Sequence, residues 1–153
     1  MAGVVFWFED NDRDTFSGRQ LDLDAWRHAL KAGGIDKARC FNVSKFDPVI
    51  IGDDDYTIAG TSKKDYIDWV DQHKHENLMF IGSQNECPES AAPLKNIDHS
   101  QVDWYIFGRS NGILKTGHEK NFMYLPTKNN LALHSLHIAS AVMLDRWGSI
   151  GAE

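Results

Sequence analysis

The sequence predicts an α/β fold in which a mostly parallel sheet is flanked by helices. Several short runs are almost continuously apolar, such as residues 4–8 and 103–108, as expected of strands buried on both faces. Between them lie segments with apolar residues at helical spacing, notably 21–34 and 62–73. Alternation of such strands and helices is typical of a parallel sheet. At 153 residues without an internal repeat or an evident linker, the sequence predicts one domain over 1–153.

The first strand is expected at Val4–Phe8, which is rich in β-branched and aromatic residues. A polar loop, EDNDRDTFSGRQ, follows it. The next segment, LDLDAWRHALKAGG, predicts a helix capped by Asp22 or Asp24 and ended by Gly33 and Gly34. An apolar stripe along this helix would face the sheet; it consists of Leu23, Trp26, Ala29 and Leu30.

A second strand is expected at 38–43, and residues 45–61 are predicted to be irregular apart from a candidate short strand, PVIIG. A helix should run over 62–73. Three further strands and a final helix complete the chain. These are NLMFIG, DWYIFG, NFMYLP and a helix over 135–147 that begins at Ser135 and precedes Gly148.

Composition excludes several classes of function. The net charge of −6 does not indicate a dominant phosphate-binding surface. Cys40 and Cys87 lie far apart and without metal-like spacing, so reduced, buried thiols are expected. The acidic segment after the first strand does not fit a signal peptide, and no apolar run approaches the roughly 20 residues that span a bilayer. A cytoplasmic protein is therefore expected.

Ligands of open parallel sheets bind beyond the carboxyl ends of the strands. Three loops occupy such positions here: 82–84, 108–112 and the stretch after Pro126. Glycine allows close approach of backbone to a ligand, so these loops are candidates for binding through backbone groups. The alternative is that they are three ordinary tight turns. The usual phosphate-binding and nucleophile-elbow motifs are absent from the sequence.

Two acidic runs support a rival hypothesis. Glu9, Asp10, Asp12 and Asp14 follow the first strand, and Asp53–Asp55 lie in the middle of the chain. Carboxylates at such a place hold Mg²⁺ in phosphotransfer enzymes, so a metal-dependent hydrolase is one alternative. Two solvated acidic loops are the other.

The C-terminal third resembles the SPOUT methyltransferases, in particular the TrmH-like branch that methylates ribose 2′-hydroxyls of tRNA and rRNA. That family has an FG-x-E-x-x-G-L loop, a strand ending in I-P, and S-L-N-L-x-x-A-V opening the last helix. The matching residues here are Phe107, Gly108, Gly112 and Ile113 for the first motif, Leu125 and Pro126 for the second, and Ser135, Leu136, Ile138, Ala141 and Val142 for the third.

The resemblance implies a C-terminal deep trefoil knot and a homodimer, and it implies S-adenosyl-L-methionine held mainly by backbone of the three loops. The cofactor-binding positions it implies are Ile81, Gly82, Phe107, Gly108, Gly112, Leu125, Ser135 and Leu136. The apolar face of the last helix would then serve either the core or the dimer interface. That face comprises Leu136, Ala139, Val142 and Met143.

The resemblance also assigns catalytic positions. Arg27, six residues before Gly33, matches the arginine that activates the hydroxyl in this branch. Ser110 stands about where the family has glutamate, and His137 stands where it has asparagine. The leading hypothesis, which the resemblance implies, is an S-adenosylmethionine-dependent methyltransferase that acts on ribose 2′-hydroxyls of RNA, with tRNA as the expected substrate. The second hypothesis is a SPOUT-like protein that binds cofactor, RNA or a protein partner without catalysis.

Overall fold

The computed structural model describes residues 2–8, 16–42, 55–109 and 115–151. Its sheet contains seven strands in the order β3-β2-β1-β6-β4-β7-β5. The helices are α1 (Phe16–Ala32), α2 (Lys63–His73) and α3 (Ser135–Arg146). The strands are β1 (Gly3–Phe8), β2 (Lys37–Asn42), β3 (Tyr56–Gly60), β4 (Leu78–Gly82), β5 (Ala92–Pro93), β6 (Trp104–Phe107) and β7 (Asn121–Tyr124). Every strand pairing in the sheet is parallel, which confirms the predicted fold class.

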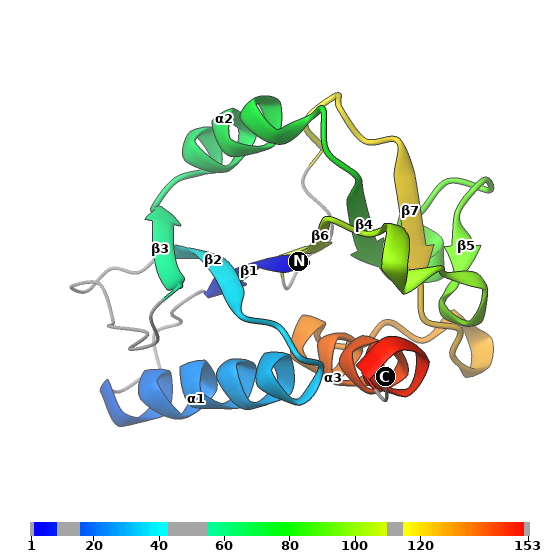
Figure 1. Cartoon of the computed structure of the whole chain (residues 1–153). Coiled ribbons are helices and arrows are strands. Elements are labelled where there is room, and N and C mark those ends of the chain that lie inside the picture. The colour runs from blue at the N-terminus through cyan, green and yellow to red at the C-terminus, as the bar shows by residue number, and fades with distance from the viewer. Residues whose placement is uncertain (1, 9–15, 43–54, 110–114, 152–153) are drawn as a thin grey trace.

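The sheet lies between two layers of helix (Figure 1). Helix α2 covers one face, and α1 and α3 lie together on the other. Alternate side chains of each strand therefore enter two separate apolar cores. Val4, Phe6 and Phe8 face α1 and α3, whereas Val5 and Trp7 face α2. Burial on both faces explains why β1 is apolar without interruption.

Helix α1 begins earlier than the sequence indicates, at Phe16 instead of about residue 21. The prediction that Asp22 or Asp24 caps it is therefore wrong, because both lie inside the helix. Asp24 instead approaches Arg27 one turn later, with 3.5 Å between carboxylate and guanidinium. The predicted end is confirmed: Gly34 follows the last turn with φ of 77°, a left-handed conformation that favours glycine.

Helices α1 and α3 pack closely at Gly33, the residue before Gly34. A Cβ on Gly33 would lie 2.6 Å from the Met143 sulfur and 2.8 Å from the Met143 Cβ. Arg146 Nε donates to the Gly33 carbonyl at 3.0 Å. The absence of a side chain at Gly33 thus lets the two helices touch.

The predicted irregular middle contains an edge strand, β3, which the sequence did not reveal. Only Tyr56 of this strand is buried, so it lacks the apolar run of the central strands. Backbone pairing to β2 supports it, and the Tyr56 hydroxyl donates to the Ile35 carbonyl at 2.7 Å. Beside it, Arg39 pairs with Asp55 at 2.9 Å. The candidate strand PVIIG lies outside the described residues.

The other elements largely follow the predicted boundaries. Helix α2 begins with a capping box in which Ser62 and Asp65 each bind the other's backbone. Helix α3 starts at Ser135, but the cap is His134, whose Nδ1 accepts from the Leu136 N–H at 3.2 Å. Short strand β5 was not predicted, because two residues carry no periodicity.

Most of the predicted apolar face of α3 belongs to the core of the chain. Ala139, Val142 and Met143 are buried against α1 and the sheet. Farther along, Leu144 and Trp147 are 67% and 50% exposed. Within the part of the chain that the structure describes, no helix has the length and apolar character required to cross a bilayer.

A polar cluster of His99, Tyr105 and Asp145 lies between the sheet and the end of α3. The His99 side chain is fully buried, with Nδ1 2.7 Å from the Tyr105 hydroxyl and Nε2 2.6 Å from the Asp145 carboxylate. Burial is the main reason that the Tyr105 pKa is raised, and Arg146 opposes that shift. This cluster connects the end of α3 to β6.

Candidate functional site at the carboxyl edge of the sheet

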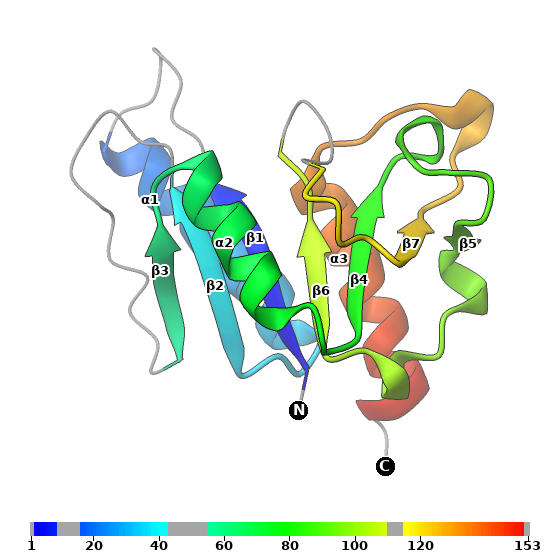
Figure 2. The ribbon, with the colours of Figure 1, turned by 90° about the horizontal axis from the view of Figure 1, so that it is seen from above.

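Three predicted loops begin at one edge of the sheet. In Figure 2 the arrows of β2, β3, β4 and β6 point to the same side. Strand β4 lies between β6 and β7, with Ile81 paired to Phe107 on one side and to Met123 on the other. Gly82 is paired with Tyr124. The chain segments that follow these strands therefore start side by side, as the sequence predicted.

The start of α3 reaches the same edge. Ser135 Oγ donates a hydrogen bond to the Gly108 carbonyl at 2.7 Å, across 27 residues of sequence. Leu125 and Leu136 are half-buried and pack against the core on the α1 and α3 face. Seven of the eight residues predicted to bind a cofactor thus gather here: Ile81, Gly82, Phe107, Gly108, Leu125, Ser135 and Leu136. The eighth, Gly112, lies outside the described residues.

Ser135→Ala is expected to lower the free energy of unfolding by about 1 kcal/mol, because it removes the hydrogen bond between α3 and the loop after β6. Ser140→Ala is the matched control on the same helix, since Ser140 Oγ donates to the Leu136 carbonyl one turn earlier and so makes a bond within α3. Urea denaturation of both variants measures the difference. Equal stability of the two would contradict a linking role for Ser135.

The loop after β4 is held by a carboxylate that sequence analysis did not select. Glu86 accepts from the Ser83 N–H at 3.1 Å and from the Ser83 hydroxyl at 2.6 Å. Cys87 lies in the same segment, with its sulfur 3.7 Å from the Met123 carbonyl. Burial raises the pKa of the Cys87 thiol to about 11, so it stays protonated at neutral pH. Ser-x-x-Glu is a capping-box pattern and was the signal available in the sequence.

A cation also lies beside this edge. The Arg109 guanidinium lies 5.1 Å from the centre of the Trp7 ring, which belongs to β1. The contact joins the ends of β6 and β1, two strands that are adjacent in the sheet. No spacing in the sequence indicated it, because residues 7 and 109 come together only through the strand order.

Arg27 lies on α1, directly after Trp26, which contacts the aromatic residue at the end of β6. The ring of Trp26 packs against Phe6 at 4.6 Å and against Phe107 at 5.7 Å, between centroids. This places α1 against the end of β6. The Arg27 side chain is 28% exposed.

The remaining predicted positions are divided. His137 is exposed in the first turn of α3, with its ring centre 6.1 Å from that of His134. Ser110 lies outside the described residues, as do the acidic residues 9–14 and 53–54. Among the residues that are described, no group of three or more His, Cys, Asp or Glu side chains could hold a metal ion.

The groups at this edge of the sheet are of the kinds that bind small organic molecules. It combines backbone groups at the ends of three strands with half-buried leucines and a few polar side chains. Sites for small organic molecules and cofactors are mostly apolar, with a small number of placed polar groups. Such an edge fits a cofactor with a flat apolar portion and polar ends.

Comparisons with solved structures identify the fold. No family model and no curated protein matches the chain. The structure resembles an rRNA methyltransferase from Sinorhizobium meliloti, with a TM-score of 0.65 and 11% identity over 97% of this chain and 56% of that chain. It also resembles the SpoU methyltransferase AviRb from Streptomyces viridochromogenes, with a TM-score of 0.65 and 13% identity over 99% of this chain and 61% of that one.

A third structure, from work on the 2-OH methylation of C/U34 on tRNA, has a TM-score of 0.64 at 10% identity. It is matched over 99% of this chain and 97% of its own length. The chain thus spans little more than half of the first two proteins and nearly all of the third. AviRb has also been solved with the cofactor AdoMet. At these identities the likeness shows a shared SpoU-type methyltransferase fold.

Proposed function

We propose that this chain, which shares the SpoU-type fold, is a SPOUT methyltransferase that uses S-adenosyl-L-methionine to methylate RNA at a ribose 2′-hydroxyl. The observation that carries the proposal is the meeting of the loops after β4, β6 and β7 with the start of α3 at one edge. The methyltransferase folds that match it extend over 97–99% of this chain. A tRNA substrate is favoured by the neighbour of nearly equal length.

The cofactor would be held by the residues that the resemblance implies. Gly82 and Gly108 offer backbone without a side chain in the way, and Leu125 and Leu136 supply apolar contact. The Ser135–Gly108 hydrogen bond keeps α3 against the loop after β6. When bound, S-adenosylmethionine supplies an activated methyl group, so the protein's task is to orient the RNA hydroxyl and assist loss of its proton.

Arg27 is the residue proposed to activate that hydroxyl. Its neighbour Trp26 contacts Phe107, so the helix that carries it is packed at the end of β6. A guanidinium keeps its charge at every physiological pH and stabilises an oxyanion by hydrogen bonding. Ser110 and His137 are proposed as the other polar members of the constellation.

The proposal includes the architecture that the resemblance implies. Residues 1–153 would form a single SPOUT-like domain with a C-terminal deep trefoil knot, acting in the cytoplasm as a homodimer. The exposed side chains of Leu144 and Trp147, at 67% and 50%, offer apolar area for a dimer contact. Sedimentation equilibrium tests the dimer: a monomer mass at working concentrations would contradict it.

The second candidate function is cofactor or RNA binding without methyl transfer. His137 and Ser110 favour it, because they stand where the family has asparagine and glutamate. The two candidates share the cofactor site and differ only in turnover.

Titration calorimetry with S-adenosylmethionine and S-adenosylhomocysteine tests the cofactor site, and we expect both to bind. Transfer of a labelled methyl group to bulk tRNA and rRNA, followed by nucleoside analysis, is then expected to give 2′-O-methylated products. Binding without transfer would favour the second candidate. If neither compound binds while Mg²⁺ does, the methyltransferase proposal is wrong, and the alternative of a metal-dependent hydrolase that uses the acidic runs is favoured.

A further inference from the structure

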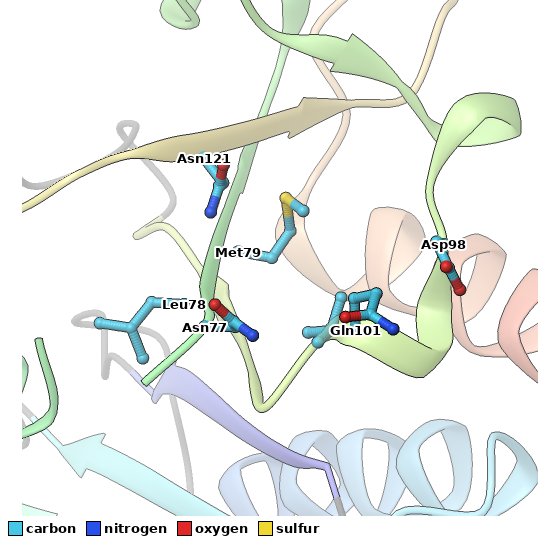
Figure 3. Close-up of a pocket in the computed structure, with 7 residues that line it drawn as sticks. Asn77, Leu78, Met79, Asp98, Gln101 and Asn121 are labelled. Atoms are coloured by element: carbon cyan, nitrogen blue, oxygen red, sulfur yellow. The ribbon is translucent and has the colours of Figure 1, made fainter. Parts of the chain in front are cut away.

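The amino edge of the sheet carries a hollow that the proposed methyl transfer does not use. It lies at the beginnings of β4 and β7 and beside the turn before β6, opposite the edge where the loops meet. It encloses about 260 Å³, close to the lower end of the roughly 300–1,000 Å³ typical of small-molecule sites. Figure 3 shows its lining residues, which are Asn77, Leu78, Met79, Asp98, Gln101, Val102 and Asn121.

Three of the lining side chains are amides with unused hydrogen-bonding capacity. Within the described segments, the amides of Asn77, Gln101 and Asn121 form no hydrogen bond to other side chains or backbone. The backbone of Asn77 is nevertheless fixed, because its N–H donates to the Asp103 carboxylate at 2.8 Å and its carbonyl accepts from Asp103. All three residues are exposed, so their amides can offer donors and acceptors to a ligand, and that of Asn77 does so from a fixed backbone.

Beneath the amides the wall is apolar. Met79 is half-buried and lies between the amides in Figure 3, and Val102, which belongs to the same core, is only 7% exposed. A thioether and branched aliphatic groups suit the face of a flat ring, while amides suit its edge. The combination fits a nucleobase.

Charge on the rim selects among bases. The Asp98 carboxylate accepts from the Ser100 N–H at 3.1 Å and from its hydroxyl at 2.6 Å, both through Oδ1. These bonds lower the Asp98 pKa, so the group is ionised at neutral pH. Its second oxygen can accept a further hydrogen bond. A carboxylate there favours an exocyclic amino group and disfavours a carbonyl oxygen.

A smaller hollow of about 120 Å³ adjoins the first and shares Asn77, Leu78 and Asn121 with it. Its lining holds Lys74 and Lys120, the carboxylate of Glu76, and two histidines, His75 and His118. Nearby Asp71 lies 3.2 Å from Lys74 and 3.0 Å from His118 and pairs with them. Lys120 remains as an exposed cation at this rim. An anionic group would fit there and would be repelled from Asp98 in the larger hollow.

We infer that the amino edge binds a nucleoside monophosphate unit whose base carries an exocyclic amino group. The base occupies the larger hollow, with its amino group toward Asp98, and the phosphate occupies the smaller hollow beside Lys120. A free nucleotide and a nucleotide within an RNA strand share this chemistry. The site stands on the opposite edge from the proposed cofactor and does not depend on methyl transfer.

The test uses NMR spectra of the ¹⁵N-labelled chain titrated with cytidine 5′-monophosphate, a probe without the adenosine of the cofactor. The side-chain amide signals of Asn77, Gln101 and Asn121 are expected to shift. Uridine monophosphate, which lacks the amino group, should bind at least about fivefold more weakly. Cytidine without phosphate should be weakened by a similar factor.

Two variants locate the ligand. Asp98→Asn keeps an acceptor for the turn but removes the charge, and is expected to abolish most of the preference for cytidine over uridine monophosphate. Lys120→Gln should weaken binding about two- to fivefold through loss of phosphate attraction. Lys63→Gln removes an equal charge at the start of α2, at the carboxyl edge of the sheet, and should leave the affinity for cytidine monophosphate unchanged.

A pentacytidylate titration distinguishes the sources. Shifts with the monophosphate assign a free nucleotide, and shifts with the pentanucleotide alone assign an RNA strand. The inference is overturned if neither ligand moves the three amide signals, or if uridine monophosphate binds as well as cytidine monophosphate. Failure of S-adenosylmethionine to bind would leave these spectra unaffected, so the two proposals fail separately.

Discussion

His99→Leu is expected to lower the free energy of unfolding by about 3 kcal/mol, among the larger effects for one substitution. His99 is fully buried and hydrogen-bonded on both ring nitrogens, to Tyr105 and to Asp145. A carboxylate only accepts, so Nε2 donates to Asp145, while Nδ1 lies 2.7 Å from the tyrosine hydroxyl. Leucine fills much of the volume but leaves the buried hydroxyl without that partner.

A double-mutant cycle separates this effect from packing. Tyr105→Phe removes the hydroxyl itself, so His99→Leu combined with Tyr105→Phe should cost at least 1 kcal/mol less than the sum of the single changes. Urea denaturation measures all four proteins. His75→Leu, at an exposed histidine, is the control and should change stability by less than about 0.5 kcal/mol. Strict additivity in the cycle would show that the cluster is not coupled.

Arg27→Ala is expected to reduce methyl transfer to RNA about 100-fold or more while leaving the affinity for S-adenosylmethionine unchanged. The reason is the proposed role of the guanidinium in activating the ribose hydroxyl, which cofactor binding does not require. Stability should hardly change, because the ion pair with Asp24 is open to solvent at 28% and 37% exposure. Single-turnover assays with labelled cofactor measure the rate.

Two further variants sharpen the assignment. Arg27→Lys keeps the positive charge without the planar fork of donors and should give an intermediate rate. His28→Ala removes the exposed neighbour on the same helix and should leave transfer at the parent rate. If the alanine variant at position 27 transfers methyl groups normally, the catalytic assignment is wrong, although the cofactor site would stand.

Agreement between sequence and structure is closest where local and tertiary forces act together. The strands at 4–8, 78–82 and 104–107 lie between the two helix layers, so their side chains are all apolar or aromatic. The α1 terminus at Gly34 was equally predictable, because its positive φ requires a residue without a Cβ. The three loops of the candidate site followed from the strand ends alone.

The features that the sequence did not predict are those with little or misleading local signal. Strand β3 is at the edge of the sheet and exposes alternate residues, so it lacks an apolar run and depends on pairing with β2 and on the buried Tyr56. The apolar stripe of α1 becomes evident only at Leu23, so the internal acids Asp22 and Asp24 were mistaken for caps. The role of Glu86 had a local signal, the Ser-x-x-Glu spacing, that sequence analysis did not select, whereas the contact of Arg109 with Trp7 joins residues that no local pattern relates.

Local patterns were sufficient for the parallel α/β class, for most element boundaries and for the order of the loops, because apolar periodicity and glycine act over a few residues. The strand order β3-β2-β1-β6-β4-β7-β5 was decided only in three dimensions. That order places β4 between β6 and β7, brings Ser135 to Gly108, and creates the hollow at the amino edge. Each of these contacts joins residues distant in sequence, and their free energy comes from packing that exists only once the whole sheet has formed.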